Sequence, residues 1–336
     1  MSRPPSAPAD EGAPASFRRL ATLTFAATYA LIVIGGVVRA THSGDACPDW
    51  PRCHGELLPP LETDVLIEFS HRFAASVVGL LVLATTIAAW RMRGITAPVR
   101  WGTAAAVALV IGQIVLGGAT VLNELDPALV SAHLAMGSTL LAVLLAVALW
   151  SLPDATGERT AGAASFRNLA VVAALATLAL MLTGAYVRGS GASLAFRDWP
   201  LFDGRLLPEG GRLAMIHATH RLAAAAAGLL LGVLAINAWR AYRRPAPAML
   251  GVALALTIYV AQVFVGAANV WTSLRAPATA AHVALSAALW ATLVGIALLA
   301  QRDAQAAPAA SRRVAREPVA TTAGEPSPGP LRARPS

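Results

Sequence analysis

The chain has 336 residues, of which 56% are hydrophobic and only 13% are charged, and its mean hydropathy is +0.60. Ordinary soluble domains of this length are not so apolar, so the composition excludes that class and indicates a protein whose solvent is the lipid bilayer. The net charge is +8 and every basic residue is an arginine. Because these arginines are distributed by loop rather than gathered in a patch, we expect no nucleic-acid partner.

Eight stretches of the sequence are long and apolar enough to cross a bilayer, which takes about 20 helical residues. The predicted class is therefore an all-α polytopic membrane protein. In chain order the predicted spans are 20–40, 65–90, 101–122, 128–150, 168–188, 213–239, 247–271 and 277–300. Tryptophans at positions 90, 101, 150, 239 and 271 lie near span ends, where amphipathic rings suit the membrane interface.

Arginines precede the first span and occupy the connections after the second, fourth and sixth spans. Connections rich in arginine stay inside the cell, so both termini are predicted to be cytoplasmic in a multi-pass protein of the cell membrane. We divide the chain into a cytoplasmic tail (1–19), a first four-helix bundle (20–152), a cytoplasmic linker (153–167), a second four-helix bundle (168–301) and a cytoplasmic tail (302–336). The last tail is rich in Ala, Pro, Arg and Ser without periodicity, and we expect it to be disordered.

An internal repeat relates the two predicted bundles, because matching polar and special residues lie 149 positions apart. The matched pairs are Arg39 and Arg188, Asp49 and Asp198, Trp50 and Trp199, Pro51 and Pro200, His71 and His220, Arg72 and Arg221, Gln113 and Gln262, Gly117 and Gly266, and His133 and His282. A constant offset at such residues indicates duplication of a four-helix unit. Since four is even, both copies enter the membrane in the same direction. We therefore predict two tandem bundles related by a pseudo-two-fold axis along the membrane normal.

Four of the seven histidines belong to this repeat: His71 and His133 in the first half, and His220 and His282 in the second. Each lies near the start of an even-numbered span, so all four are expected at similar depth toward the outer face and inside the bundles, where a polar side chain avoids lipid. Two imidazoles from different helices can provide the axial ligands of a haem iron. Smaller metal ions fit less well, since no carboxylates or thiols cluster with each pair. The alternative is that each histidine only hydrogen-bonds a neighbouring helix.

Four outer-side arginines support the haem interpretation. Arg72 and Arg221 directly follow histidines, while Arg39 and Arg188 end the first and fifth spans. A guanidinium can pair with a haem propionate, so all four are candidates for propionate binding. The alternative for each is that a long side chain simply reaches the membrane interface.

The halves also differ in one ionisable position beside the histidines. Glu68 lies three residues before His71, on the same helical face, whereas the second half has His217 at this position. A carboxylate beside one haem only could take or give a proton. A structural pairing between this carboxylate and a nearby arginine is the alternative.

The only two cysteines are a second difference. Cys47 and Cys53 fall in the first outer loop, where the second half has Phe196 and Phe202. The topology places this loop in the oxidising compartment, so we predict a disulfide rather than a pair of free thiols.

The run GGVVRATHSGDACPDWPRCHG at 35–55, followed by EFSHR at 68–72, closely resembles haem A synthase, and the resemblance extends over all eight predicted spans. It implies oxidation of a ring methyl group of haem O to a formyl group, by successive hydroxylations and loss of water, giving haem A for terminal oxidases. The second-half loop, with Phe196 and Arg197, follows the family motif less well.

The resemblance also implies roles for individual residues. His71 and His133 would ligate or flank the substrate haem O, His220 and His282 would hold a permanent haem b, Glu68 would serve catalysis, and Cys47 and Cys53 would form the loop disulfide. Candidate protein partners are the haem O synthase and an oxidase assembly factor, alongside the lipid bilayer. No residue of the sequence identifies the electron acceptor.

Two other functions compete with this interpretation. A dihaem b-type membrane cytochrome that exchanges electrons with quinone would carry the same four histidines, but it has less need of a carboxylate and a cysteine pair in one half only. A transporter built on a parallel repeat is the third option. It fits least, because the sequence offers no matching pair of spans broken by Gly or Pro.

Overall fold

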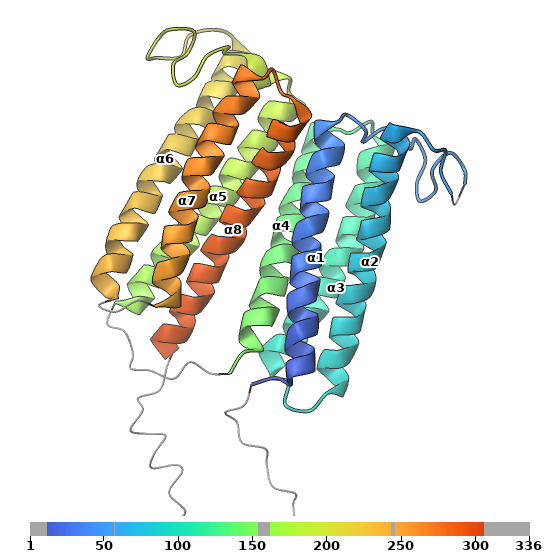
Figure 1. Cartoon of the computed structure of the whole chain (residues 1–336), viewed down its shortest axis with the longest axis vertical. Coiled ribbons are helices and arrows are strands. Elements are labelled where there is room, and N and C mark those ends of the chain that lie inside the picture. The colour runs from blue at the N-terminus through green and yellow to red at the C-terminus, as the bar shows by residue number, and fades with distance from the viewer. Residues whose placement is uncertain (1–11, 57, 154–161, 243–245, 306–336) are drawn as a thin grey trace, which may run out of the picture.

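The computed structural model describes residues 12–56, 58–153, 162–242 and 246–305. Within these ranges the chain forms eight long helices, as predicted, and one short 3-10 helix (Figure 1). The elements are α1 (Ala15–Ala40), α2 (Thr63–Arg91), α3 (Ala97–Leu122), α4 (Pro127–Trp150), α5 (Ala163–Gly189), η1 (Ala192–Leu194), α6 (Arg212–Ala241), α7 (Pro247–Trp271) and α8 (Ala276–Gln305).

Local sequence signals begin and end these helices. Asp126 caps α4 by accepting hydrogen bonds from the N–H groups of Ala128 and Leu129, at 2.9 and 3.1 Å from its Oδ1 atom. Pro127 follows as the first helical residue, where its missing N–H costs nothing. The preceding connection turns sharply because Glu124 and Leu125 both adopt positive φ values.

The eight helices form two four-helix bundles side by side, α1–α4 and α5–α8 (Figure 1). Helices α1 and α4 of the first bundle pack against α8, and α4 also packs against α5. Hydrogen bonds cross this seam, among them those from Trp290 Nε1 to the Ser138 carbonyl at 2.9 Å and from Tyr29 Oη to the Ala284 carbonyl at 3.1 Å. Helix α8 is the most buried of the eight, so the seam is part of the hydrophobic core.

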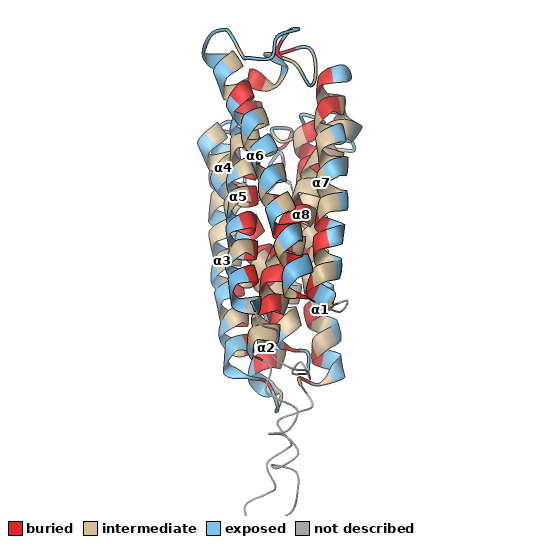
Figure 2. Cartoon of the chain, turned by 90° about the vertical axis from the view of Figure 1, so that its left-hand side faces the viewer, coloured by how far each residue is buried: buried red, intermediate tan, exposed pale blue. Residues whose placement is uncertain are grey.

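The outward faces of the helices are apolar and exposed, as expected for contact with lipid tails. Figure 2 shows exposed positions along α6 and α7, and these include large apolar side chains. Examples are Leu222, Leu229, Val233 and Ile236 on α6, and Leu250, Leu254, Val260 and Phe264 on α7. The five tryptophans predicted for the membrane interface are also exposed and lie in the end turns of their helices.

The sequence repeat extends to the conformation of the backbone. Cis peptide bonds precede both Pro51 and Pro200, which are 149 residues apart. Positive φ values recur with the same offset at His42 and Gly191, His54 and Asp203, Gly55 and Gly204, Glu124 and Ser273, and Leu125 and Leu274. The two halves therefore share loop geometry as well as helix order, while the pseudo-two-fold axis along the membrane normal stays a prediction.

Three predicted boundaries differ from the structure. Helix α8 continues to Gln305, so residues 302–305 are helical rather than part of a disordered tail; Arg302 donates a hydrogen bond to the Leu149 carbonyl at 3.1 Å across the seam. Helix α1 begins at Ala15, inside the predicted N-terminal tail, and Phe17 is buried. Helix α5 begins at Ala163, which shortens the linker. Residues 1–11, 154–161 and 306–336 of the predicted tails and linker lie outside the described residues.

Candidate functional site

The four repeat-paired histidines lie near the first turns of α2, α4, α6 and α8, and each imidazole faces a glycine of the preceding helix. A Cβ atom on Gly35 would lie 3.0 Å from Cε1 of His71, and one on Gly184 would lie 3.0 Å from Cε1 of His220. For Gly117 with His133 and Gly266 with His282 the corresponding distances are 3.3 and 3.2 Å. The glycines let neighbouring helices approach closely enough to hold each ring in place.

Two glutamines connect the helices at the level of the second histidine in each half. Gln113 Nε2 donates to the His133 carbonyl at 2.9 Å, and Gln262 Nε2 donates to the His282 carbonyl at 3.0 Å. The Oε1 atoms of both glutamines are buried without a hydrogen-bond partner in the described part of the chain. The same contact therefore ties α3 to α4 and α7 to α8.

Three of the four imidazoles have an Nδ1 atom without a hydrogen-bond partner in the part of the chain that the structure describes. The Nδ1 atoms of His71, His133 and His282 are buried, and none has a hydrogen-bond partner among the described residues. Within each half the two histidines are close enough for their charges to interact. The described residues contain no group of three or more His, Cys, Asp or Glu side chains that could hold a metal ion. Paired imidazoles that line the space between helices fit a haem, whose iron needs one or two axial ligands.

Two of the four candidate arginines remain available at the same end of the bundles. Arg188 Nη2 donates to Nε2 of His42 at 2.8 Å, while its Nε atom is buried without a partner among the described residues. Arg39 is half-buried and forms no side-chain hydrogen bond or ion pair within them. Guanidinium groups placed in this way could accept an anionic group of a ligand.

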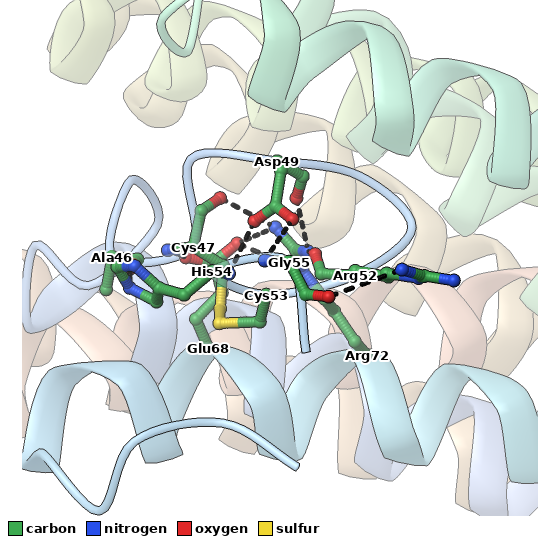
Figure 3. Close-up of a disulfide and its surroundings, with 9 residues drawn as sticks. All are labelled: Ala46, Cys47, Asp49, Arg52, Cys53, His54, Gly55, Glu68 and Arg72. Atoms are coloured by element: carbon green, nitrogen blue, oxygen red, sulfur yellow. Dashed lines mark hydrogen bonds and ion pairs between the residues drawn. A yellow bond between two sulfur atoms is a disulfide. The ribbon is translucent and has the colours of Figure 1, made fainter. Parts of the chain in front are cut away.

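Glu68 is engaged with the first outer loop (Figure 3). Its Oε2 atom accepts from the Cys47 N–H at 2.7 Å, and its Oε1 atom accepts from Nε of Arg72 at 3.1 Å. The carboxylate is buried, with 4% of its side chain exposed. The structure therefore contains the arginine pairing that the sequence left open as an alternative. Whether Glu68 also transfers protons stays a prediction.

Arg72 does not fit the role predicted for it. Besides Glu68, its guanidinium donates to the carbonyls of Cys47, Asp49 and Arg52 at 2.7–3.0 Å, so all five of its N–H groups have acceptors (Figure 3). A propionate would have to displace one of these contacts. Arg72 instead clamps the loop onto α2.

Two further features close the first loop. Cys47 and Cys53 form a disulfide, as predicted, and both are buried. Asp49 accepts from the N–H groups of Gly55 at 2.8 Å and His54 at 2.6 Å (Figure 3). The Gly55 hydrogen bond is the main reason that the pKa of the Asp49 carboxyl lies below its usual range.

The second outer loop has the same pattern of hydrogen bonds as the first, but other side chains lie at its centre. Asp198 accepts from the N–H groups of Asp203 and Gly204 at 2.8 and 2.7 Å, and the Gly204 bond lowers the pKa of its carboxyl. Phe196 and Phe202 occupy the cysteine positions, with ring centroids 4.9 Å apart.

Arg221 clamps this second loop as Arg72 clamps the first. It donates to the carbonyls of Leu201 and Asp198, both at 2.8 Å, and to Nε2 of His217 at 3.1 Å. It also lies 5.5 Å from the centroid of each phenylalanine ring in the loop. Arg221 therefore clamps the second loop through three of its five N–H groups, and its role in propionate binding stays a prediction.

Sequence reasoning missed two kinds of residue in this site. Gly35 and Gly184 match each other in the repeat, and this match is the signal that could have identified their close approach to His71 and His220. His42 has no histidine counterpart 149 residues on and so gives no signal in the sequence, yet it contacts Arg188 of the other half. A contact between halves leaves no trace in a comparison of one half with the other.

Comparisons with known proteins agree with this architecture. Residues 18–294 match the family model COX15-CtaA, described as "Cytochrome oxidase assembly protein". The chain is 29% identical over 325 residues to "Heme A synthase" of Geobacillus kaustophilus, covering 94% of this chain and 99% of the relative. It is 31% identical over 291 residues to "Heme A synthase" of Symbiobacterium thermophilum (82% and 92%), and 28% identical over 263 residues to that of Shouchella clausii (76% and 87%).

Proposed function

The chain belongs to the COX15-CtaA family of cytochrome oxidase assembly proteins, and from this premise we propose that it is a haem A synthase. It oxidises a ring methyl group of haem O to a formyl group and so makes haem A for terminal oxidases. The observation that most directly supports this proposal is that each half has two imidazoles, both packed against glycines, at the same end of its bundle.

The two halves hold different haems in this proposal. His71 and His133 ligate or flank haem O, the substrate, while His220 and His282 hold a resident haem b. When bound, the haem b supplies an iron that accepts and donates single electrons. Support comes from the asymmetry of the halves: the imidazoles, glycines and glutamines repeat, but Glu68 and the disulfide occur only in the first.

The overall reaction needs two hydroxylations of the methyl group, after which the geminal diol loses water to give the aldehyde. With water as the oxygen donor, the net change from methyl to formyl releases four electrons and four protons, so an electron acceptor is required and the protons must be carried away. Glu68 is the group that we assign to proton transfer, because it is the carboxylate one helical turn from His71. Its hydrogen bonds to Cys47 and Arg72 fix its position.

Propionate binding is assigned to Arg39 and Arg188. Arg188 has a buried Nε atom without an acceptor among the described residues, and Arg39 lies close enough to Arg188 for the two charges to interact. Two propionates would neutralise this pair of like charges. Arg72, whose five N–H groups are all engaged, stabilises the first loop instead, while Arg221 stabilises the second loop and stays a candidate for propionate binding.

The protein lies in the cell membrane with both termini in the cytoplasm and the haem sites toward the outer face. Support comes from arginine-rich connections at the end of the bundles opposite the two long loops (Figure 1). The haem O synthase and an oxidase assembly factor are the proposed protein partners, because haem O and haem A are too apolar to pass through water.

The test is expression of the full chain in a host that makes haem O but no haem A, followed by chromatography of haems extracted from the membranes. Haem A should appear with the parent chain and be absent with a His71→Ala variant that accumulates equally in the membrane. Membranes that contain the protein with bound haem b but no haem A would reject the synthase and favour the dihaem cytochrome.

A further inference from the structure

The first histidines of the two halves, His71 and His220, differ from each other in one hydrogen bond. Nδ1 of His220 lies 2.9 Å from Oγ1 of Thr183 on α5. The same Oγ1 atom donates its only proton to the carbonyl of Leu180 at 2.8 Å. The two contacts are both hydrogen bonds when Oγ1 accepts from His220, and in this arrangement Nδ1 carries the proton and Nε2 keeps its lone pair. This is the tautomer in which Nε2 can bind a metal.

The first half lacks this hydroxyl. The position 149 residues before Thr183 is Ile34, although Leu31 matches Leu180. Nδ1 of His71 is buried and has no hydrogen-bond partner among the described residues. The packing of the two rings is otherwise alike, since each lies against a glycine at the same distance from Cε1. The hydroxyl of Thr183 is thus a second chemical difference around these histidines, in addition to Glu68 and His217.

We propose that Thr183 is a positioning residue that holds His220 as an Nε2 ligand and so makes the second-half site the one that retains its haem. Hydrogen bonds of this kind fix the orientation of a metal-binding imidazole and raise its basicity. Ile34 leaves His71 without such support, which suits a site that must take up one haem and release another. This inference rests on the proposed function, because it assumes that both sites bind haem.

The test compares full-length Thr183→Val and Thr183→Ser proteins, both with His71→Ala so that the signal comes from the second half. Valine keeps the shape of threonine without the hydroxyl, whereas serine keeps the hydroxyl. Transfer of haem to excess apomyoglobin should be about 10- to 100-fold faster for Thr183→Val than for the His71→Ala parent. The midpoint potential of its haem should also rise, because a less basic imidazole stabilises the ferric iron less. Thr183→Ser should behave like the parent in both measurements.

Ile34→Thr in a His220→Ala background is the reciprocal change, with the Leu31 carbonyl available to orient the new hydroxyl. Its first-half haem should transfer more slowly than that of the His220→Ala parent. An unchanged transfer rate and potential in Thr183→Val, or no slowing in Ile34→Thr, would overturn the role of Thr183. A parent chain that binds no haem, or keeps two haems after His220→Ala, would instead overturn the proposed function.

Discussion

Glu68 has a structural role in the fold and a proposed role in the reaction. Its carboxylate receives the Cys47 N–H and the Arg72 guanidinium, whereas His217 meets Arg221 in the second half. The first-half histidine therefore has a carboxylate beside it, whereas its second-half counterpart has an imidazole whose Nε2 atom accepts a hydrogen bond. Removing the charge of Glu68 while keeping its shape separates the two roles.

We expect Glu68→Gln to reduce haem A formation by about 100-fold or more, because a general acid or base contributes about 10²–10⁴-fold. The second-half haem should stay bound, since His220 and His282 are untouched. Haem A and haem b are measured by chromatography of extracted haems. Glu62→Gln, at an exposed position six residues earlier, is the matched control and should keep activity. Normal haem A yield from Glu68→Gln would remove Glu68 from the reaction.

Substitution of a glycine beside one of the histidines tests how the imidazole ring packs. In Gly184→Ala the new Cβ would lie 3.0 Å from His220 Cε1, so the ring must tilt. Overpacking of this kind costs about 1–3 kcal/mol, and we expect the second half to retain less haem.

Gly232 on α6 provides the control for this prediction, because a Cβ there meets nothing within 4 Å. Gly232→Ala should leave haem content unchanged and favour the helix by up to about 1 kcal/mol. Haem per protein is measured by the pyridine haemochrome spectrum. Equal haem content in both variants would show that the His220 ring does not depend on Gly184.

At the scale of elements, the two outer loops share one pattern of hydrogen bonds but differ in the residues at their centres. A carboxylate binds two backbone N–H groups in each, and an arginine from the following helix clamps three carbonyls in the first loop and two in the second. The first loop adds a disulfide and the second a pair of phenylalanines. These shared hydrogen bonds therefore hold each loop over its histidines. The side chains at the centre of the loop can differ between the halves.

The first loop should lose stability in acid. The pKa of Asp49 is lowered in the folded loop, mainly by the Gly55 N–H, so its contribution is complete above the pKa of the unfolded loop. That contribution is lost as the pH falls through the lower, folded pKa. Reduction of the buried Cys47–Cys53 disulfide by a phosphine, which acts in acid, should accelerate in this range.

Asp49→Asn is the control for the acid prediction, because an amide does not titrate. Its disulfide should be reduced faster than that of the parent at neutral pH, with a difference that shrinks in acid. If both proteins showed the same pH profile, Asp49 would not hold the loop through its charge.

At the scale of the whole molecule, the halves are joined by apolar packing of α1 and α4 with α5 and α8 and by a contact from His42 to Arg188. This last contact links the loop of the proposed substrate half to a proposed propionate ligand of the other half. The seam thus brings the two sites into one unit at one end of the molecule.

The topology of the whole chain gives a prediction that is independent of haem. In a Cys47→Ser, Cys53→Ser background, a cysteine replacing exposed Glu209 should react with a membrane-impermeant maleimide in intact cells. A cysteine replacing exposed Arg93 should react only after the membrane is opened. Labelling of both in intact cells, or the reverse order, would contradict the orientation.

The sequence alone determined the eight spans, their repeat and the loop disulfide, because apolar length, a constant offset and a lone cysteine pair are local or periodic signals. Pairing of His71 and His133 within one half also followed from the repeat. By contrast, the engagement of Arg72 and Arg221 in the loops needed the fold, since carbonyl acceptors carry no sequence signature.

Tertiary structure alone decided which side chains meet across helices. The contact between Thr183 and His220 joins residues 37 positions apart, and the contact between Arg188 and His42 joins residues 146 apart. Neither contact has a counterpart in the other half, so the repeat could not reveal them. Such contacts depend on the rotation of each helix about its axis and on its distance from its neighbours. Both are set by the packing of all eight helices together.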